Sequence, residues 1–486
     1  LSIRRQRQMC IRDRSTTMHF MPGCEILQSF DLVHWEHATY VYETLDHTDA
    51  QQLKSGQNIY GQGMWAASLR YHEGRFYICF VANDTRKTYL YTSEKIDGPW
   101  KKQLIEGFYH DGSLLFDEDG RNYIVYGNDE IWITELNEDL TAPKKDGLHR
   151  LLVSDHKNPE LGYEGSHIQK INGYYYIFLI HSLRDRWMRT EACFYSDSLE
   201  GEFTGGDVLC DDRGYCGQGV AQGGIVDTPD GKWYAMLFQD SGAVGRIPIL
   251  LPVTWKDHFP VFGQNGHVPE EIEVHSTRPG YIYQPLVGSD DFCNGLLPRW
   301  QFNHDPDPRY YHLDALQGTY TITTREVCTE LTQAVNTLTQ RMSYPSCAAE
   351  VTVDASALKE GDVAGLCAFQ GCYAAVGITK HHGKYEVLML DKKEDGILDM
   401  TEGTVVESHQ MDFRLEADFC NMKDEARCYY RVNKGDWLPI GTVHKLYFKL
   451  DHFTGCRFGL FCYAAEETGG SACFRDFKYY DVDEIS

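Results

Sequence analysis

Three polar residues stand at matching places in a repeated sequence pattern. Asp111 precedes an apolar run, a DEDG turn and a Tyr-rich run, and Glu164 precedes an apolar run, an Asn-Gly turn and a run of Tyr, Ile and Phe. Gln222 stands before the same pattern. Two carboxyl groups that meet in a pocket can protonate a leaving oxygen and activate a water. These residues are therefore candidates for general acid–base chemistry.

The elements that would position them are short strands joined by tight turns. Asn-Gly between two β-rich runs is the strongest short-range hairpin signal. The turn-aromatic marks recur at a period of roughly 45–60 residues, the range of propeller blades; they are Gly74-Tyr77, Gly120-Tyr123, Gly173-Tyr176 and Gly231-Tyr234. Blades are arranged radially. We therefore expect Asp111, Glu164 and Gln222 to converge on one axis, with Trp65 at the head of another repeat.

The chain divides into a propeller and a second β-rich unit. The pattern predicts an all-β protein, with a five-bladed β-propeller over residues 15–268 and a linker over 269–284. Alternating strands then predict a jelly-roll-like, concanavalin-like β-sandwich over 285–486. Helical periodicity is nearly absent before residue 260.

The first residues differ in character from the rest. Residues 1–14, LSIRRQRQMCIRDR, contain five Arg and lack the apolar stretch of a secretory signal. A short basic arm is one interpretation. We favour another, that the stretch is foreign and the natural start is missing. From Ser15 the sequence reads as a strand, a turn and a strand, so we expect a first blade that lacks its first strand.

Composition excludes some classes of partner. The formal charge of −25 and the pI near 5.2 argue against nucleic acid and against an anionic membrane surface. No apolar run approaches the ~20 residues of a spanning helix. The sixteen Cys are scattered through strands without paired spacing, so we expect reduced thiols in a cytoplasmic protein and no metal site.

Taken alone, each acid is more often a solvated turn residue or an acceptor for backbone N–H groups at a strand end. The shared register favours a functional role. A central funnel can hold two carboxyl groups at the roughly 6.5–9.5 Å that an inverting cleavage of a glycosidic bond requires.

Several runs resemble glycoside hydrolase family 43, which contains β-xylosidases and α-L-arabinofuranosidases on a five-bladed propeller. They are STTMHFMPGCEI, GMWAASLRYHEGRFYICF, FYHDGSLLFDEDGRNYIVYG, GYEGSHIQKINGYYYIFL and GGIVDTPDGKWYAMLFQDSGAVGRIPILLPVTW. The run DDFCNGLLPRWQFNHDPD resembles the start of the C-terminal domain of its two-domain xylosidase branch. The resemblance covers nearly everything after Arg14.

The resemblance implies catalytic roles. Glu164 matches the general acid, and Asp111 matches the acid that orients it and modulates its pKa. The family's general base is an Asp in the first strand of blade one, about a dozen residues before the STTMHF run. Asp13 lies only two residues before Ser15. We therefore expect this chain to lack a correctly placed general base.

The resemblance also suggests a sugar pocket. Arg246 matches an Arg that reaches into it, although a surface ion pair is the competing interpretation. Trp65, His19 and Phe20 are candidate walls, each as compatible with a core position. Gln222 stands near a family His associated with water or calcium. Because an amide is a weaker metal ligand, we expect no required cofactor and consider calcium doubtful.

The leading hypothesis is an inverting, exo-acting glycosidase that releases xylose from β-1,4-xylo-oligosaccharides or α-L-arabinofuranose from substituted chains. The alternative is a non-catalytic carbohydrate-binding propeller, which the expected lack of a base favours. A propeller that only assembles proteins is a third possibility. A homo-oligomer is possible, and the sequence does not distinguish the two sugars.

Overall fold

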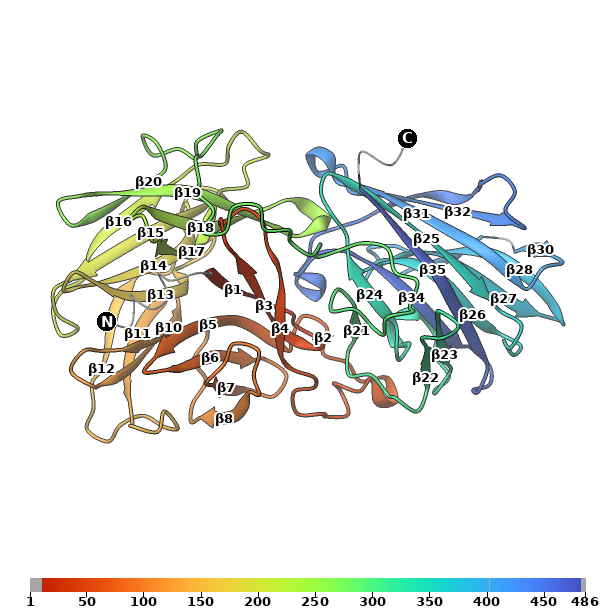
Figure 1. Cartoon of the computed structure of the whole chain (residues 1–486), viewed down its shortest axis with the longest axis horizontal. Helices are drawn as coiled ribbons and strands as arrows, with labels where there is room; N and C mark the ends of the chain where they lie inside the picture. The colour runs from red at the N-terminus through yellow and green to blue at the C-terminus, as the bar shows by residue number, and fades with distance from the viewer. Residues whose placement is uncertain (1–10, 402, 482–486) are drawn as a thin grey trace.

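The chain folds into two β-rich domains that lie side by side (Figure 1). The computed structural model describes residues 11–401 and 403–481. The regular elements of these residues are strands and short 3-10 helices, which turns and loops connect. The 3-10 helices are η1 (Lys54–Gly56), η2 (Gly242–Val244), η3 (Leu331–Gln333), η4 (Cys420–Met422) and η5 (Leu450–His452). No helix in the described part of the chain is long and apolar enough to cross a bilayer.

The N-terminal domain is a five-bladed β-propeller, which confirms the predicted fold. Four blades each hold four antiparallel strands. Their strands are β5 (Met64–His72), β6 (Arg75–Ala82), β7 (Lys87–Ser93) and β8 (Lys101–Ile105); β9 (Ser113–Phe116), β10 (Asn122–Asn128), β11 (Glu130–Leu136) and β12 (His149–Ser154); β13 (Glu164–Ile171), β14 (Tyr174–Ser182), β15 (Arg189–Ser196) and β16 (Thr204–Leu209); and β17 (Ala221–Asp227), β18 (Trp233–Asp240), β19 (Arg246–Lys256) and β20 (Phe259–Phe262).

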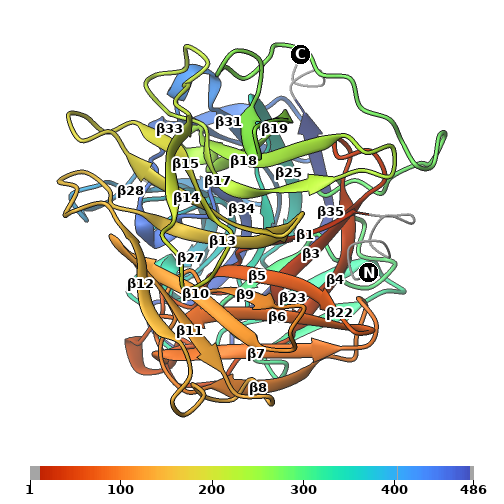
Figure 2. The same cartoon turned by 90° about the vertical axis from the view of Figure 1, so that its left-hand side faces the viewer.

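The first blade is smaller. Its described residues hold three strands, one fewer than each other blade: β1 (Ile11–Ser15), β3 (Gly23–Ser29) and β4 (Glu36–Tyr42). Residues 11–14 of β1 belong to the stretch that we expected to be foreign, while residues 1–10 of that stretch lie outside the described part. Figure 2 shows β1, β5, β9, β13 and β17 gathered around the middle of the propeller.

The predicted Asn-Gly hairpin joins β13 and β14. Ile171 pairs with Tyr174, so Asn172 and Gly173 form a two-residue turn. Both have positive φ, 51° and 87°, as a type I′ turn requires. The alternating apolar side chains of these strands then pack between neighbouring blades, where Ile168, Ile177 and Leu179 are fully buried.

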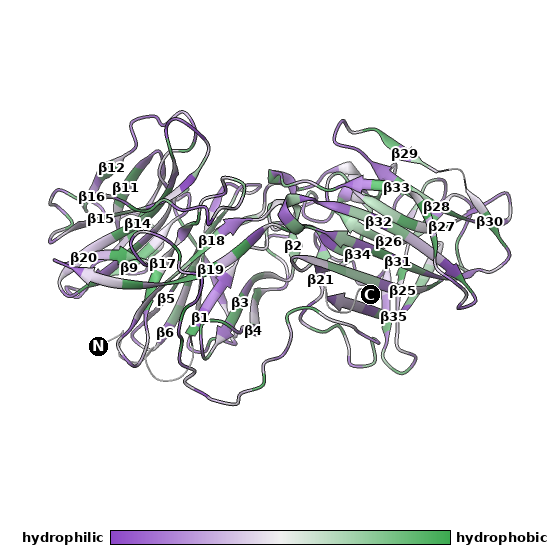
Figure 3. Cartoon of the chain, turned by 90° about the horizontal axis from the view of Figure 1, so that it is seen from above, coloured by the Kyte–Doolittle hydropathy of each residue, from purple (hydrophilic) through white to green (hydrophobic). Residues whose placement is uncertain are grey.

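The C-terminal domain is a β-sandwich of two sheets whose apolar residues form a common core. Figure 3 shows hydrophobic residues, in green, along its strands. One sheet contains β2 (Phe20–Met21), β21 (Gln301–Asn303), β24 (Leu338–Arg341), β34 (Arg457–Ala464), β26 (Asp362–Phe369), β27 (Ala374–His381), β28 (Lys384–Lys392), β29 (Leu398–Met400) and β30 (Thr404–Val406). The other contains β22 (Tyr311–Asp314), β23 (Thr319–Thr323), β35 (Ser471–Asp481), β25 (Ser346–Asp354), β31 (Gln410–Asp418), β32 (Glu425–Val432) and β33 (Leu438–Lys445).

The two domains share a sheet. β2 comes from the segment between β1 and β3 of the propeller, yet it pairs with β21 of the sandwich through Phe20↔Asn303 and Met21↔Phe302. The segment between β20 and β21 also returns along blade one, where the Tyr281 hydroxyl donates to Glu36. The domain junction is therefore made from both ends of the propeller sequence.

Candidate active site

In three of the five blades, the first strand begins with a β-bulge. In β5, β13 and β17 the pairing with the second strand of the blade gains one extra residue, after Met64, Glu164 and Ala221 respectively. Such a β-bulge bends the strand and re-aims its side chains. The repeated register predicted from the sequence therefore includes a repeated bulge that the sequence pattern did not reveal.

These strand heads surround a cavity of about 960 Å³. Five residues singled out in the sequence line it, namely Trp65, Asp111, Glu164, Gln222 and Arg246. They come from blades two, three, four and five, so residues far apart in the chain converge as the blade geometry predicts.

Glu164 and Asp111 line the cavity and lie close to each other and to His110. One ligand atom from each of these three residues lies within 4.8 Å of the other two. Asp111 Oδ2 accepts a hydrogen bond from the Gly165 backbone N–H at 2.9 Å, and Asn128 Nδ2 donates to Glu164 Oε2 at 2.7 Å. Asp111 is thus fixed against the backbone next to Glu164.

Burial and charge shift the pKa of two of these groups. Burial raises the pKa of the Asp111 carboxyl, and the Glu164 charge raises it further, against the opposing effect of His110. Burial lowers the pKa of His110, but the Glu164 carboxylate, 3.8 Å away, and the Asp111 charge raise it above the ordinary value overall. The sequence analysis missed His110, although it directly precedes Asp111.

Arg246 lies between two aromatic rings that also line the cavity. Its guanidinium carbon is 4.0 Å from the centre of the Phe238 ring and 3.8 Å from that of Phe453. Its Nε lies 3.3 Å from Asp240 Oδ1, and its Nη1 donates to Gln222 Oε1 at 3.4 Å. Burial lowers the pKa of Arg246 to about 9.

Phe453 is the aromatic residue that the sandwich contributes to the cavity, which Arg341 of β24 also lines. It follows η5 and, with Thr454, lines the cavity. Its ring stacks on Trp65 at 6.2 Å between ring centres, and Trp65 in turn lies 6.0 Å from His110. No repeat or motif marks Phe453 in the sequence, because its position depends on how the two domains pack.

Two expected wall residues lie elsewhere. His19 and Phe20 are fully buried at the junction between the domains and do not line the cavity. The cause is the pairing of β2 with β21, which carries this segment away from the propeller axis. His19 instead packs against His304 and His452, and the Phe20 ring lies 3.6 Å from the Arg457 guanidinium carbon.

Asp13 also lines the cavity, from β1. Its Oδ1 accepts hydrogen bonds from the backbone N–H of Arg14 at 2.8 Å and from Arg14 Nη1 at 2.5 Å. The same Arg14 donates through Nε to the Ala67 carbonyl at 2.8 Å. The Asp13 carboxylate is therefore already paired with a neighbouring cation.

The arrangement does not fit a calcium ion at Gln222. Calcium takes six to eight oxygen ligands. The side-chain amide oxygen of Gln222 instead accepts a hydrogen bond from Arg246. The backbone N–H of Gln222 donates to Glu191 Oε2 at 2.7 Å. A guanidinium so close to the amide disfavours a second cation there.

Comparison with known proteins agrees with these observations. Residues 11–260 match the family described as glycosyl hydrolases family 43, and residues 289–480 match the family described as the β-xylosidase C-terminal concanavalin A-like domain. A β-xylosidase of Formosa agariphila is 25% identical over 96% of this chain and 85% of its own length.

Solved structures are similar as well. A bifunctional GH43-CE protein of Bacteroides eggerthii has a TM-score of 0.90 and 41% identity over 98% of this chain. This chain spans only 61% of that protein. A GH43 glycoside hydrolase engineered to display both endo-xylanase and exo-arabinofuranosidase activity has a TM-score of 0.85 and 26% identity, over 98% of this chain and 96% of that one. The family model matches residues 11–260, which are more than half of the whole chain. The chain therefore belongs to glycosyl hydrolase family 43.

Proposed function

We propose that this protein is built as an inverting, exo-acting glycosidase for terminal β-1,4-linked xylose or α-L-arabinofuranose. The observation that carries the proposal is the close pair of Glu164 and Asp111, with His110 beside them, in a cavity that Trp65 and Phe453 also line. The names of the relatives, which include a β-xylosidase and an enzyme with exo-arabinofuranosidase activity, support the substrate class.

The cavity offers both surfaces that a sugar requires. The rings of Trp65 and Phe453 can cover its apolar face. Trp65 Nε1 and Asp111 Oδ1 are buried without a hydrogen-bond partner in the described part of the chain. Arg246 presents a planar fork that can reach two adjacent hydroxyls.

In the proposed mechanism Glu164 is the general acid. It transfers a proton to the glycosidic oxygen as the bond between that oxygen and the anomeric carbon breaks. Asp111 acts through Glu164 and through Gly165, whose backbone it holds. Phe453 brings the sandwich to the cavity, and the proposed preference for terminal units assigns it the role of limiting how far a chain can extend there.

An inverting mechanism also needs a second carboxylate as general base, and neither Asp111 nor Asp13 suits that role. Glu164 and Asp111 have oxygen atoms within 4.8 Å of each other. An inverting pair stands roughly 6.5–9.5 Å apart so that a water fits beside the sugar. Asp111 is only 6% exposed and serves better as an orienting residue than as a base. Asp13, held by Arg14, is also poorly suited to the role.

Azide tests the proposal on the protein as it exists. When a general base is lacking, azide can replace the activated water and attack the anomeric carbon directly, while nitrophenol leaves with the proton from Glu164. We expect azide to accelerate nitrophenol release from nitrophenyl β-xyloside or α-L-arabinofuranoside by about 10²-fold, the order of a lost general base. The product should be the glycosyl azide of inverted configuration, identified by NMR.

Matched variants locate the effect. Glu164→Gln should abolish the stimulation by azide, whereas Asp13→Asn should leave it unchanged. Restoring a family-like first strand with its Asp should restore hydrolysis without azide. Azide-independent hydrolysis that is lost in Asp13→Asn and regained with azide would make Asp13 the base and contradict the proposal.

The alternative function is non-catalytic carbohydrate binding, which the lack of a suitable base among the described residues favours. Calorimetry with xylobiose beside the azide assay separates the two. Binding with no turnover under any azide concentration, and none after strand repair, would establish the alternative. Absence of both binding and turnover would contradict both functions.

A further inference from the structure

An exposed tryptophan stands on the same blade as Glu164, outside the cavity described above. Trp187 belongs to the connection between β14 and β15 and is 45% exposed. The Arg189 guanidinium carbon lies over its ring, 5.4 Å from the ring centre. A large ring that is supported by a cation and open to solvent is a surface on which another flat molecule can stack.

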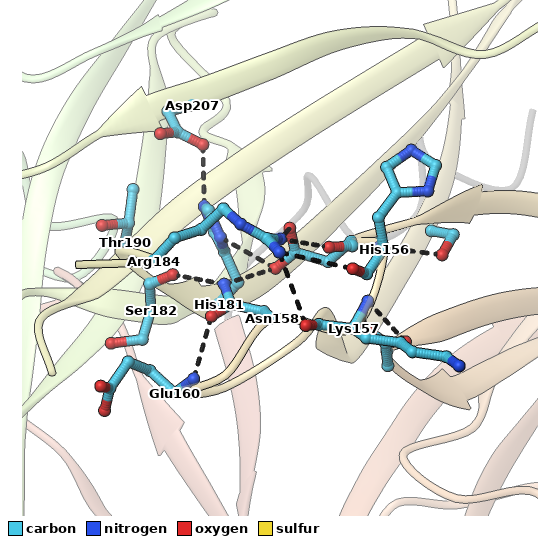
Figure 4. A network of polar contacts seen from close by, with 12 residues as sticks. His156, Lys157, Asn158, Glu160, His181, Ser182, Arg184, Thr190 and Asp207 are labelled. Carbon is cyan, nitrogen blue, oxygen red and sulfur yellow. Dashed lines mark hydrogen bonds and ion pairs between the residues drawn. The ribbon is translucent and has the colours of Figure 1, made fainter. Parts of the chain in front are cut away.

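Arg184, which lies in the connection that carries Trp187, and Ser182, where β14 ends, belong to a network of polar contacts (Figure 4). Arg184 donates through Nη1 to the Asp155 carbonyl at 2.5 Å and through Nη2 to the His156 carbonyl at 3.4 Å. Ser182 Oγ accepts from the Met188 backbone N–H at 2.7 Å. Trp187 therefore sits in a braced connection, which lowers the entropy that a ligand would lose by ordering it.

The same network reaches the segment that leads into Glu164. His181 lies between two carboxylates, 2.8 Å from Asp207 and 3.3 Å from Asp155. Asn158 Nδ2 bridges Asp155 and the Ser182 carbonyl, at 2.8 and 2.7 Å. The Ser182 backbone N–H then donates to the Leu161 carbonyl, three residues before Glu164. The supports of Trp187 and of Glu164 thus form one connected unit.

Trp187 is also tied to the wall of the cavity. Arg189, which lies over its ring, is 5.5 Å from the centre of Phe238 and forms an ion pair with Asp240 at 3.1 Å. Phe238 lines the cavity, and Asp240 holds Arg246. One layer of alternating rings and guanidinium groups therefore extends from the cavity to Trp187.

We propose that Trp187 is an acceptor subsite, on which the sugar unit beyond the cleaved bond stacks. This inference rests on the proposed function. A general acid contacts the glycosidic oxygen, so the leaving group must lie on the side of the cavity that carries Glu164. Glu164 pairs with Ile180, and β14 ends two residues later, at the start of the connection that carries Trp187. The axial C–H bonds of a pyranose suit the negative face of an indole ring.

Calorimetry with xylose and xylotriose tests the subsite on the full chain. The wild-type protein should bind xylotriose more tightly than xylose, and Trp187→Ala should lower the ratio of the two affinities about tenfold, the scale of one lost stacking contact. Trp437→Ala is the matched control. Trp437 lies in the sandwich and is also covered by a guanidinium, with the Arg431 carbon 4.3 Å from its ring centre.

The outcomes separate the two proposals. An unchanged ratio in Trp187→Ala, or an equal loss of affinity for both sugars, would overturn the subsite while leaving the proposed function intact. Failure of the wild-type protein to bind either sugar would overturn the proposed function itself. Trp187→Phe, which keeps an aromatic ring, should retain the ratio to within about threefold and guards against misfolding of the Ala variant.

Discussion

Phe453 of the sandwich covers Arg246 of the propeller, with 3.8 Å between the guanidinium carbon and the centre of the ring. The second domain therefore completes the cavity of the first. A cation held against an aromatic face is stabilised by the ring quadrupole. The contact also removes Arg246 from water, in agreement with its lowered pKa.

Removing this ring should weaken sugar binding. We expect Phe453→Ala to lower the affinity for xylose about five- to tenfold, because one wall and one cation–π contact are lost. Calorimetry measures the change. Leu450→Ala is the control, since Leu450 lies three residues away on η5 and is exposed. Equal affinities for the two variants would contradict the role given to Phe453.

Asp240 should be essential for the stability of the propeller. It pairs with both Arg189 and Arg246, at 3.1 and 3.3 Å, so Asp240→Asn leaves two guanidinium groups without their carboxylate. We expect a loss of about 3 kcal/mol in the free energy of unfolding, as for a broken buried ion pair. Urea denaturation measures it.

The control is an exposed aspartate. Asp230 lies 3.9 Å from Lys232 near the surface, and Asp230→Asn should cost less than about 1 kcal/mol. Asp240→Glu should restore part of the lost stability. A cost for Asp240→Asn no larger than that of the control would show that the two arginines do not depend on it.

Gly165 should resist substitution because of both its backbone and its surroundings. Its φ is +67°, and an added Cβ would lie 2.7 Å from Gln222 Nε2. We expect Gly165→Ala to cost about 1–3 kcal/mol of stability and to displace Gln222 from Arg246. Gly173→Ala, where φ is +87° and no atom lies within 4 Å of the added Cβ, isolates the backbone contribution. Equal losses in the two variants would exclude a role for the contact with Gln222.

The histidines at the domain junction should make the fold sensitive to acid. Burial lowers the pKa of His19, His304 and His452, that of His304 to about 3. Below the ordinary histidine pKa the unfolded chain binds protons that the folded chain does not, so stability falls as the pH decreases toward 3. Between pH 7 and 5, His304 alone should account for about 2 kcal/mol.

Urea denaturation at both pH values checks this expectation. Because buried carboxyl groups with raised pKa contribute the opposite slope, the informative quantity is the difference between wild type and His304→Asn. The difference in stability should shrink at pH 5. His382→Asn, on an exposed turn, should show no such change. A difference independent of pH would mean that His304 titrates normally in the fold.

Local pattern was sufficient to predict the propeller and the convergence of its strand heads. The repeat places Asp111, Glu164 and Gln222 at equivalent positions of three blades. Because the blades are arranged radially, equivalent positions at their inner ends lie close together. The bulges after Met64, Glu164 and Ala221 were not predicted, because an extra residue in a strand leaves the turn spacing almost unchanged.

Contacts between domains could not be predicted in the same way. Phe453 reaches the cavity, and His19 and Phe20 leave it, only because two distant segments pack together. Their local sequence is compatible with either position, since an aromatic side chain fits a core and a binding wall equally well. His110 is different. It directly precedes Asp111, which the repeat had already marked, so the sequence position next to a candidate acid could have identified it.

The two-residue strand β2 links the two domains permanently. It leaves the propeller sequence after β1 and returns at β3, so neither domain can be excised as one uninterrupted gene fragment without taking a strand from the other. An isolated sandwich beginning at residue 285 would expose the free edge of β21 and invite self-association. A propeller fused to a different domain would likewise need a new pairing partner for β2 in place of β21.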